Sequence, residues 1–185
     1  MEVFKIFNKL RVEKFIKEVR SNLDSKESEL IKAFVNLKEL SFPKAACVLV
    51  IDTSFSYNTG FYLAVNEDMF NEVDRVSEDS EYTDGLILVD NFILYSRDKI
   101  GFDDFFIEND LEKVQMKEVS QWIKKCFDLA QVTLPLPIYF RFPDEEYALN
   151  LVTGEWEDEM EIELKKRLGQ NTSFSFFSVR NEKPE

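Results

Sequence analysis

The sequence predicts one α+β domain, in which a mainly antiparallel sheet packs with helices and an N-terminal helical pair comes first. Two observations predict this fold class. The first forty residues carry apolar side chains at helical spacing, and the remainder mixes short apolar runs with amphipathic helices. A chain of 185 residues fits a single domain, which we divide into the helical pair (1–42) and a mixed sheet and helix body (45–180).

The helical pair is predicted by two apolar faces. Each helix repeats apolar residues on one side: Phe15, Ile16, Val19 and Leu23 in the first, then Leu30, Ile31, Phe34 and Leu37 in the second. Asp24 stands three residues before Glu27, a spacing that predicts a capping box at the second helix. That helix must end before Pro43.

The body begins with a predicted hairpin. The run 45–55 is apolar and rich in β-branched residues, and 61–65 is a second strand after turn residues. Asn66 is then a candidate cap for a short helix. That helix would place four apolar side chains on one side, namely Met69, Phe70, Val73 and Val76. An acidic loop follows at 77–85.

A second tight hairpin is predicted from two apolar runs, 86–89 and 92–95, which are separated only by Asp90 and Asn91. The segment 97–110 reads as irregular and Phe-rich. Its aromatic residues allow two interpretations. Either they tuck under the sheet as core, or they form an exposed apolar anchor inside an acidic rim. These aromatic residues are Phe102, Phe105 and Phe106.

The C-terminal half is predicted to contain a strong amphipathic helix at 117–131, strands at 138–142 and 147–152, a helix at 155–168 and a last strand at 173–179. In the helix at 155–168 the inward stripe would be Trp156, Met160, Leu164 and Leu168. The same stretch also alternates as a strand would, through Met160, Ile162 and Leu164, so both alternatives stay open.

The charge is unevenly distributed along the chain. The net charge is −13, yet residues 1–44 hold ten Lys/Arg against seven Asp/Glu, while 45–185 hold thirteen against twenty-nine. The stretch 142–163 contains nine carboxylates and no basic residue. Such a field repels nucleic acid and anionic membranes and attracts basic proteins, so we expect no direct contact with nucleic acid or membrane.

Several kinds of chemistry are disfavoured by composition. The chain has no histidine, which excludes Ser-His-Asp and Cys-His catalysis and any zinc site that needs histidine. No Gly-rich nucleotide loop occurs, and we expect no cofactor. Cys47 and Cys126 each lie in an apolar segment, which is typical of buried free thiols in a reducing cytosol. The N-terminus lacks the continuous apolar stretch of a signal peptide, and we expect a cytoplasmic protein.

One enzymatic alternative rests on a short pattern. Pro143 and Asp144 follow a predicted strand, and Glu163 and Lys165 come later, which looks like the PD…(D/E)xK pattern of metal-dependent nucleases. The resemblance implies acids that hold Mg²⁺ and a lysine that polarises the attacking water. The negative field would oppose a polyanionic substrate.

The sequence therefore favours a non-catalytic acidic binding protein, with an immunity protein that neutralises a basic, nuclease-type bacterial toxin domain as the best example. A dipole-matched, solvated helix explains part of the acidic pattern, but not nine acids without a compensating cation. A third alternative is a subunit of a larger complex in which the helical pair docks elsewhere. The predicted partner-binding residues are Glu78, Asp79, Glu81, Asp84, Asp103, Asp104, Phe105, Asp144, Glu145, Glu146, Glu155, Glu157, Asp158, Glu159 and Glu161.

Overall fold

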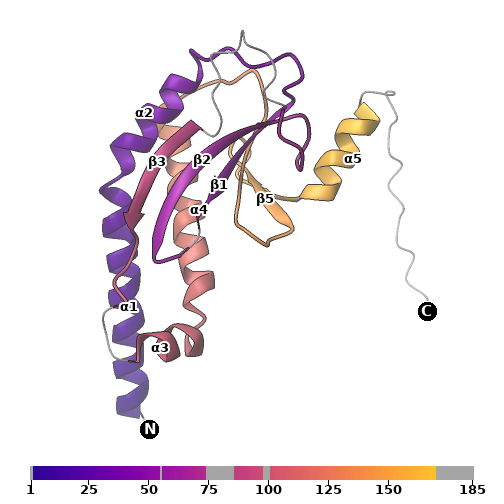
Figure 1. Ribbon diagram of the computed structural model, residues 1–185. Coiled ribbons are helices and arrows are strands. Elements are labelled where there is room, and N and C mark those ends of the chain that lie inside the picture. The colour runs from indigo at the N-terminus through magenta and orange to yellow at the C-terminus, as the bar shows by residue number, and fades with distance from the viewer. Residues whose placement is uncertain (1, 55, 74–85, 98–100, 170–185) are drawn as a thin grey trace, which may run out of the picture.

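The part of the chain that the structure describes forms one six-stranded sheet, in the order β3-β2-β1-β4-β5-β6. Strands β1, β2, β3 and β5 are labelled in Figure 1. The computed structural model describes residues 2–54, 56–73, 86–97 and 101–169. Its helices are α1 (Glu2–Asp24), α2 (Glu27–Leu37), α3 (Phe102–Glu108), α4 (Leu111–Ala130) and α5 (Glu159–Gly169). Its strands are β1 (Val48–Thr53), β2 (Asn58–Asn66), β3 (Leu86–Ile93), β4 (Ile138–Arg141), β5 (Tyr147–Asn150) and β6 (Trp156–Asp158).

The sheet is antiparallel at every neighbouring pair except β1 and β4. The predicted first hairpin is confirmed, because β1 pairs with β2 and places Leu49 opposite Val65. The parallel pair, with Val50 opposite Tyr139, is connected through β2, β3, α3 and α4. A crossover of this length is what two parallel strands require. The predicted α+β class with a mainly antiparallel sheet is confirmed.

The two faces of the sheet are covered unequally. Alternate residues of a strand point to opposite faces, so Leu49, Ile51 and Phe140 join the larger core, which also contains side chains from α1, α2 and α4. On the other face, Val48 and Val50 belong to a small cluster against which Ile162 of α5 packs. In Figure 1, α5 accordingly lies apart from α1, α2 and α4.

The predicted helical pair is confirmed as α1 and α2. Phe34 is fully buried and meets Phe127 of α4 edge-on, with ring centroids 5.3 Å apart. The predicted capping box is wrong, because Lys26 is the N-cap residue of α2 and makes no side-chain cap bond. Glu27 instead accepts a hydrogen bond from Lys125 of α4, which ties the pair to the body.

The short helix predicted after Asn66 does not form in the described part of this segment. Asn66 is the last residue of β2, and the chain then turns so that Asn66 and Glu72 form an isolated bridge. The Asp68 carboxylate accepts hydrogen bonds from the amides of Phe70 and Asn71, both at 2.8 Å. The Asp68 side chain thus takes backbone amide hydrogen bonds that stabilise a turn, in a segment whose apolar spacing predicted a helix. Residues 74–85, including the predicted acidic loop, lie outside the described residues.

The hairpin predicted around Asp90 and Asn91 is also wrong. Both residues lie inside β3, which continues to Ile93. The longer strand β2 pairs with β3 on both sides of these two residues, with Phe92 and Ile93 after them and Val89 before them, and the register shifts in between. Asn91 is further held by a hydrogen bond from Tyr62 Oη to Asn91 Oδ1, at 3.0 Å. Asp-Asn is too weak a turn pair to interrupt such a strand.

The segment 97–110 contains a helix that sequence analysis missed. Gly101, with φ of 71°, precedes α3, and Asp110, with φ of 49°, separates α3 from α4. The strong helix predicted at 117–131 is confirmed in kind, although α4 begins six residues earlier and ends at Ala130. Phe102 and Phe105 are buried and Phe106 packs against them, as the core interpretation expected.

The C-terminal elements differ from prediction mainly in their boundaries. The strand predicted at 138–142 is β4, and β5 ends at Asn150 rather than at 152. The helix predicted at 155–168 is divided into β6 and α5, because Asp158 caps the helix through the amides of Met160 and Glu161, at 2.9 and 3.1 Å. The strand predicted at 173–179 lies outside the described residues.

The two cysteines are unpaired, with Cys126 buried and Cys47 half-buried. Burial raises the pKa of the Cys126 thiol to about 12. Among the helices that the structure describes, none combines the length and the apolar character needed to span a membrane.

Candidate functional site

The structure gathers part of the predicted acidic surface at one corner of the sheet. Asp144, Glu145 and Glu146 lie exposed in the turn between β4 and β5. The Glu159 amide donates a hydrogen bond to the Glu146 carbonyl at 3.0 Å, which brings this turn against the first residue of α5. Asp158 faces Tyr147 across the β5–β6 pair. We call the group Asp144, Glu145, Glu146, Asp158 and Glu161 the acidic edge.

The acidic edge has little internal compensation. Within the described residues, none of its five carboxylates forms an ion pair, although Asp158 accepts the capping hydrogen bonds of α5. The neighbouring Glu157 is different, because it lies 3.7 Å from Lys165. Glu155 is exposed at the opposite end of β5 and β6, where its carbonyl accepts from the Asn150 amide. The edge is therefore a concentrated, solvent-facing negative charge.

Helix α5 presents the opposite face from the one that sequence analysis expected. Met160, Leu164 and Leu168 follow each other at i, i+4 and i+8, yet they are 69%, 57% and 46% exposed. The most buried residues of α5 are Glu159 and Glu163, each only 7% exposed, and Ile162 is partly buried against the sheet beside them. The prediction of an inward Trp156–Leu168 stripe is therefore wrong. We call Met160, Leu164 and Leu168 the α5 stripe.

The strands explain this orientation, because they offer α5 a cation. Arg141 of β4 binds Asp52 of β1 at 2.5 Å and donates to the Met69 carbonyl at 3.0 Å. Its guanidinium also lies 3.8 Å from Glu159. Glu163 is bound by Arg167 of the next helical turn, at 3.0 Å. Inward carboxylates thus meet positive charge, while Ile162 supplies the apolar contact of α5 with the sheet.

The compensation of these two acids is incomplete. Glu159 Oε1 and Glu163 Oε2 are buried without a hydrogen-bond partner in the part of the chain that is described. Burial raises the pKa of Glu159, and the charge of Arg141 only partly opposes this. A carboxylate held in this way costs free energy relative to an apolar contact. In the observed orientation of α5, both inward carboxylates therefore carry a desolvation cost that their cations offset only in part.

The remaining predicted contact residues lie elsewhere. Asp103 and Asp104 are exposed on α3, at the far end of the molecule from α5 (Figure 1), and Asp103 binds Arg97 at 2.6 Å. Phe105 is buried, so it does not present the exposed anchor that its alternative interpretation required. Four predicted acids, Glu78, Asp79, Glu81 and Asp84, lie outside the described residues. The described members of the predicted surface thus do not form one continuous patch.

The nuclease-like pattern is not assembled as its resemblance implied. Glu163 and Lys165 lie on α5, a helix, and not on a strand. Glu163 is engaged by Arg167 and Lys165 lies near Glu157, while Asp144 is exposed in a turn with φ of 63°. Across the described residues, no group of three or more Asp, Glu, Cys or His is arranged to hold a metal ion.

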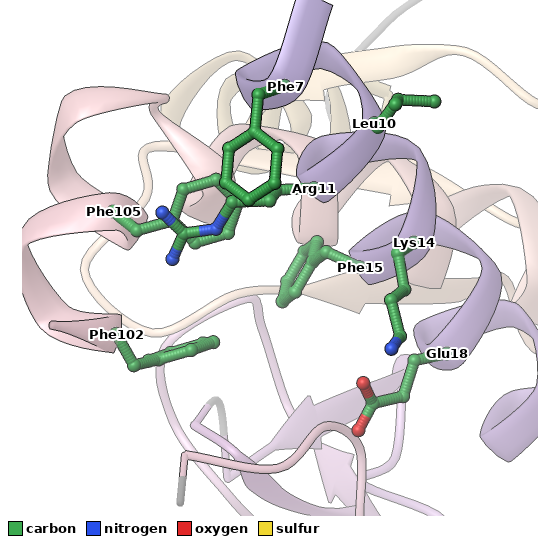
Figure 2. A pocket seen from close by; sticks show the side chains of 8 residues that line it. All are labelled: Phe7, Leu10, Arg11, Lys14, Phe15, Glu18, Phe102 and Phe105. Atoms are coloured by element: carbon green, nitrogen blue, oxygen red, sulfur yellow. The ribbon is translucent and has the colours of Figure 1, made fainter. Parts of the chain in front are cut away.

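A groove that sequence analysis missed lies between α1 and α3 (Figure 2). Its volume is about 350 Å³, at the lower end of the range of small-ligand sites. Phe7, Leu10, Arg11, Lys14, Phe15 and Glu18 of α1 line it together with Phe102 and Phe105 of α3. The signal was present in the sequence, because Ile6, Phe7 and Leu10 add apolar positions beyond those needed for the buried face of α1.

Comparisons of the chain with protein-family models, with curated proteins and with solved structures gave no match.

Proposed function

We propose that this chain is a non-catalytic binding protein that docks onto a basic protein through the α5 stripe and the acidic edge. The observation that supports it most is the orientation of α5. This helix keeps two carboxylates inside and three large apolar side chains outside. A surface helix of a water-soluble fold is expected to turn its apolar side chains inward and its carboxylates outward. An exposed apolar stripe usually marks an interaction site.

The two surfaces adjoin each other at the start of α5. Met160 opens the stripe, and Asp158 and Glu161 of the acidic edge flank it in the sequence. An apolar centre beside a charged rim is the usual anatomy of a protein interface, in which the buried centre supplies most of the affinity. Covering a Leu or Met side chain contributes roughly 1.5–3 kcal/mol before the costs of association.

The net negative charge of the chain favours a positively charged protein as the partner. A chain with a net charge of −13 attracts a positively charged protein over several ångströms and accelerates its association. Toxin domains that act on nucleic acid need a positive cleft to bind phosphates. We infer that the partner is such a domain, that this chain blocks its cleft in the cytoplasm, and that the chain is an immunity protein.

The direct test is co-expression of the full chain with the products of the genes that neighbour its own gene, followed by co-purification at low and high salt. We expect a basic partner whose binding weakens as salt rises. The double variant Met160→Ser/Leu164→Ser should lower affinity about tenfold or more, because it removes the apolar centre. Partial exposure of both side chains means that the fold should persist, which circular dichroism would verify.

A matched pair of charge variants locates the contact. Asp144→Lys/Glu145→Lys should slow association strongly, whereas Asp103→Lys/Asp104→Lys makes the same charge change on α3 and should have a much smaller effect. A neutral or acidic partner, or equal effects of the two pairs, would contradict the proposal.

A further inference from the structure

The groove between α1 and α3 has the composition of an amphipathic binding site. Phe7 and Leu10 form its rim, 60% and 57% exposed, and Phe15, Phe102 and Phe105 are buried at its base. Ile6, on the same end of α1, is also exposed and lies beyond the groove's lining. The apolar surface therefore continues past the hollow, which favours an extended occupant over a small molecule.

Two cations, Arg11 and Lys14, line this groove. The Arg11 guanidinium lies 3.9 Å from the centroid of the Phe105 ring, which orients it across the opening (Figure 2). Within the described residues neither Arg11 nor Lys14 forms an ion pair. Glu18, the acid of the lining, already accepts a hydrogen bond from the Ser96 amide at 2.8 Å.

The lining of the groove is net positive, with Arg11 and Lys14 against Glu18, although the exposed Asp103 and Asp104 of α3 adjoin it in the sequence. Residues 1–44 carry a net charge of +3 and residues 45–185 one of −16. In Figure 1 the groove-forming ends of α1 and α3 lie far from α5. An acidic segment would be repelled by the acidic edge and attracted here. The complementary ligand has apolar side chains for the rim and a carboxylate for Arg11 and Lys14.

We propose that the groove between α1 and α3 is a second docking site, which takes an amphipathic, acidic segment of a partner protein. Apolar anchors spaced by one helical turn would lie on Phe7, Leu10 and Phe15, in the mode by which an amphipathic helix occupies a hydrophobic groove. An Asp or Glu of the segment would pair with Arg11 and Lys14. This site is independent of the proposed contact at α5, so one chain can hold a basic and an acidic protein together.

The test uses a random library of twelve-residue peptides, displayed on phage and selected on the full-length protein. Counter-selection on Arg11→Glu/Lys14→Glu removes peptides that bind elsewhere. We expect the enriched peptides to contain Asp or Glu among apolar residues, and to bind the double variant at least about tenfold more weakly than the unchanged protein. Phe7→Ser should also weaken the binding of these peptides.

The matched control is Lys17→Glu, which reverses a charge on the same helix but outside the groove's lining. It should leave affinity within about twofold, while the loss of a desolvated ion pair at the groove costs far more. No enriched peptide, peptides without acidic residues, or equal binding to Arg11→Glu/Lys14→Glu would overturn the proposal. Binding of phosphatidylglycerol vesicles through Phe7 and Arg11, without peptide enrichment, would overturn it in favour of a membrane. The proposed function at α5 is untouched by any of these results.

Discussion

Truncation of Leu164 to Ala distinguishes the observed orientation of α5 from the one that sequence periodicity suggested. If Leu164 faced the core, its loss would destabilise the protein by about 2–5 kcal/mol, as buried Leu to Ala changes do. In the structure it is 57% exposed. The matched comparison is Leu30→Ala on α2, where the side chain is completely buried.

The expected magnitudes follow from burial. Full burial of a Leu side chain contributes roughly 2 kcal/mol, and less than half of Leu164 is buried, so its truncation should cost below about 1 kcal/mol. Ala also has a slightly more favourable helix propensity than Leu, which lowers the cost of the truncation by ~0.2 kcal/mol. Leu30→Ala loses the whole transfer free energy and leaves a cavity, so it should cost about 2–5 kcal/mol.

The assay is urea unfolding followed by circular dichroism for the unchanged protein and both variants. A domain of this kind is stable by roughly 5–15 kcal/mol, so both changes are measurable. We expect similar slopes of free energy against urea, with midpoints that separate the two variants clearly. Equal losses from Leu164→Ala and Leu30→Ala would refute the orientation of α5, and with it the binding surface proposed there.

Two variants and one labelling experiment probe the contacts beneath α5 and in the core. Glu159→Gln should stabilise the protein by about 1 kcal/mol at pH 7, because burial raises the pKa of Glu159 above its ordinary value of 4.5 and the charged form is costly. Unfolding curves across pH should show this gain vanish below pH 4.5, where the carboxyl is protonated in both states; a gain that instead grows on acidification would contradict it. Arg141→Ala should cost roughly 1–3 kcal/mol in urea unfolding, because it leaves Asp52 and Glu159 without their cation, and an unchanged midpoint would count against this network. Cys126 should resist a thiol reagent at pH 8 in the folded protein, since with a pKa of about 12 only about one thiol in ten thousand is ionised, whereas Cys47 should react first; equal rates would show that Cys126 is accessible.

Periodicity predicted which residues share a face more reliably than which face is buried. Met160, Leu164 and Leu168 do lie on one side of α5, as the four-residue spacing requires. On the side of α5 that meets the sheet, Glu159 lies near Arg141, which binds Asp52 of a strand 89 residues away in the sequence. Nothing local to α5 encodes that pair, so the sequence of the helix alone favoured the wrong orientation.

Predictions from short turn-like sequences were also wrong where strand pairing continued past them. Asp90 and Asn91 look like a turn in isolation, yet β2 extends far enough to pair with residues on both sides of them. The groove was missed for a related reason. Its apolar residues on α1 were visible as an excess, but the opposite wall is α3, and this segment was expected to be irregular. By contrast, the helical pair and the strong helix α4 needed only their own apolar stripes.

The most direct measurement is amide hydrogen exchange of the full chain, alone and bound to the basic partner recovered with it. We predict slower exchange over residues 144–168 in the complex, where the acidic edge and the α5 stripe would be covered, and little change over α3. Slower exchange confined to other parts of the chain, with residues 144–168 unchanged, would contradict it.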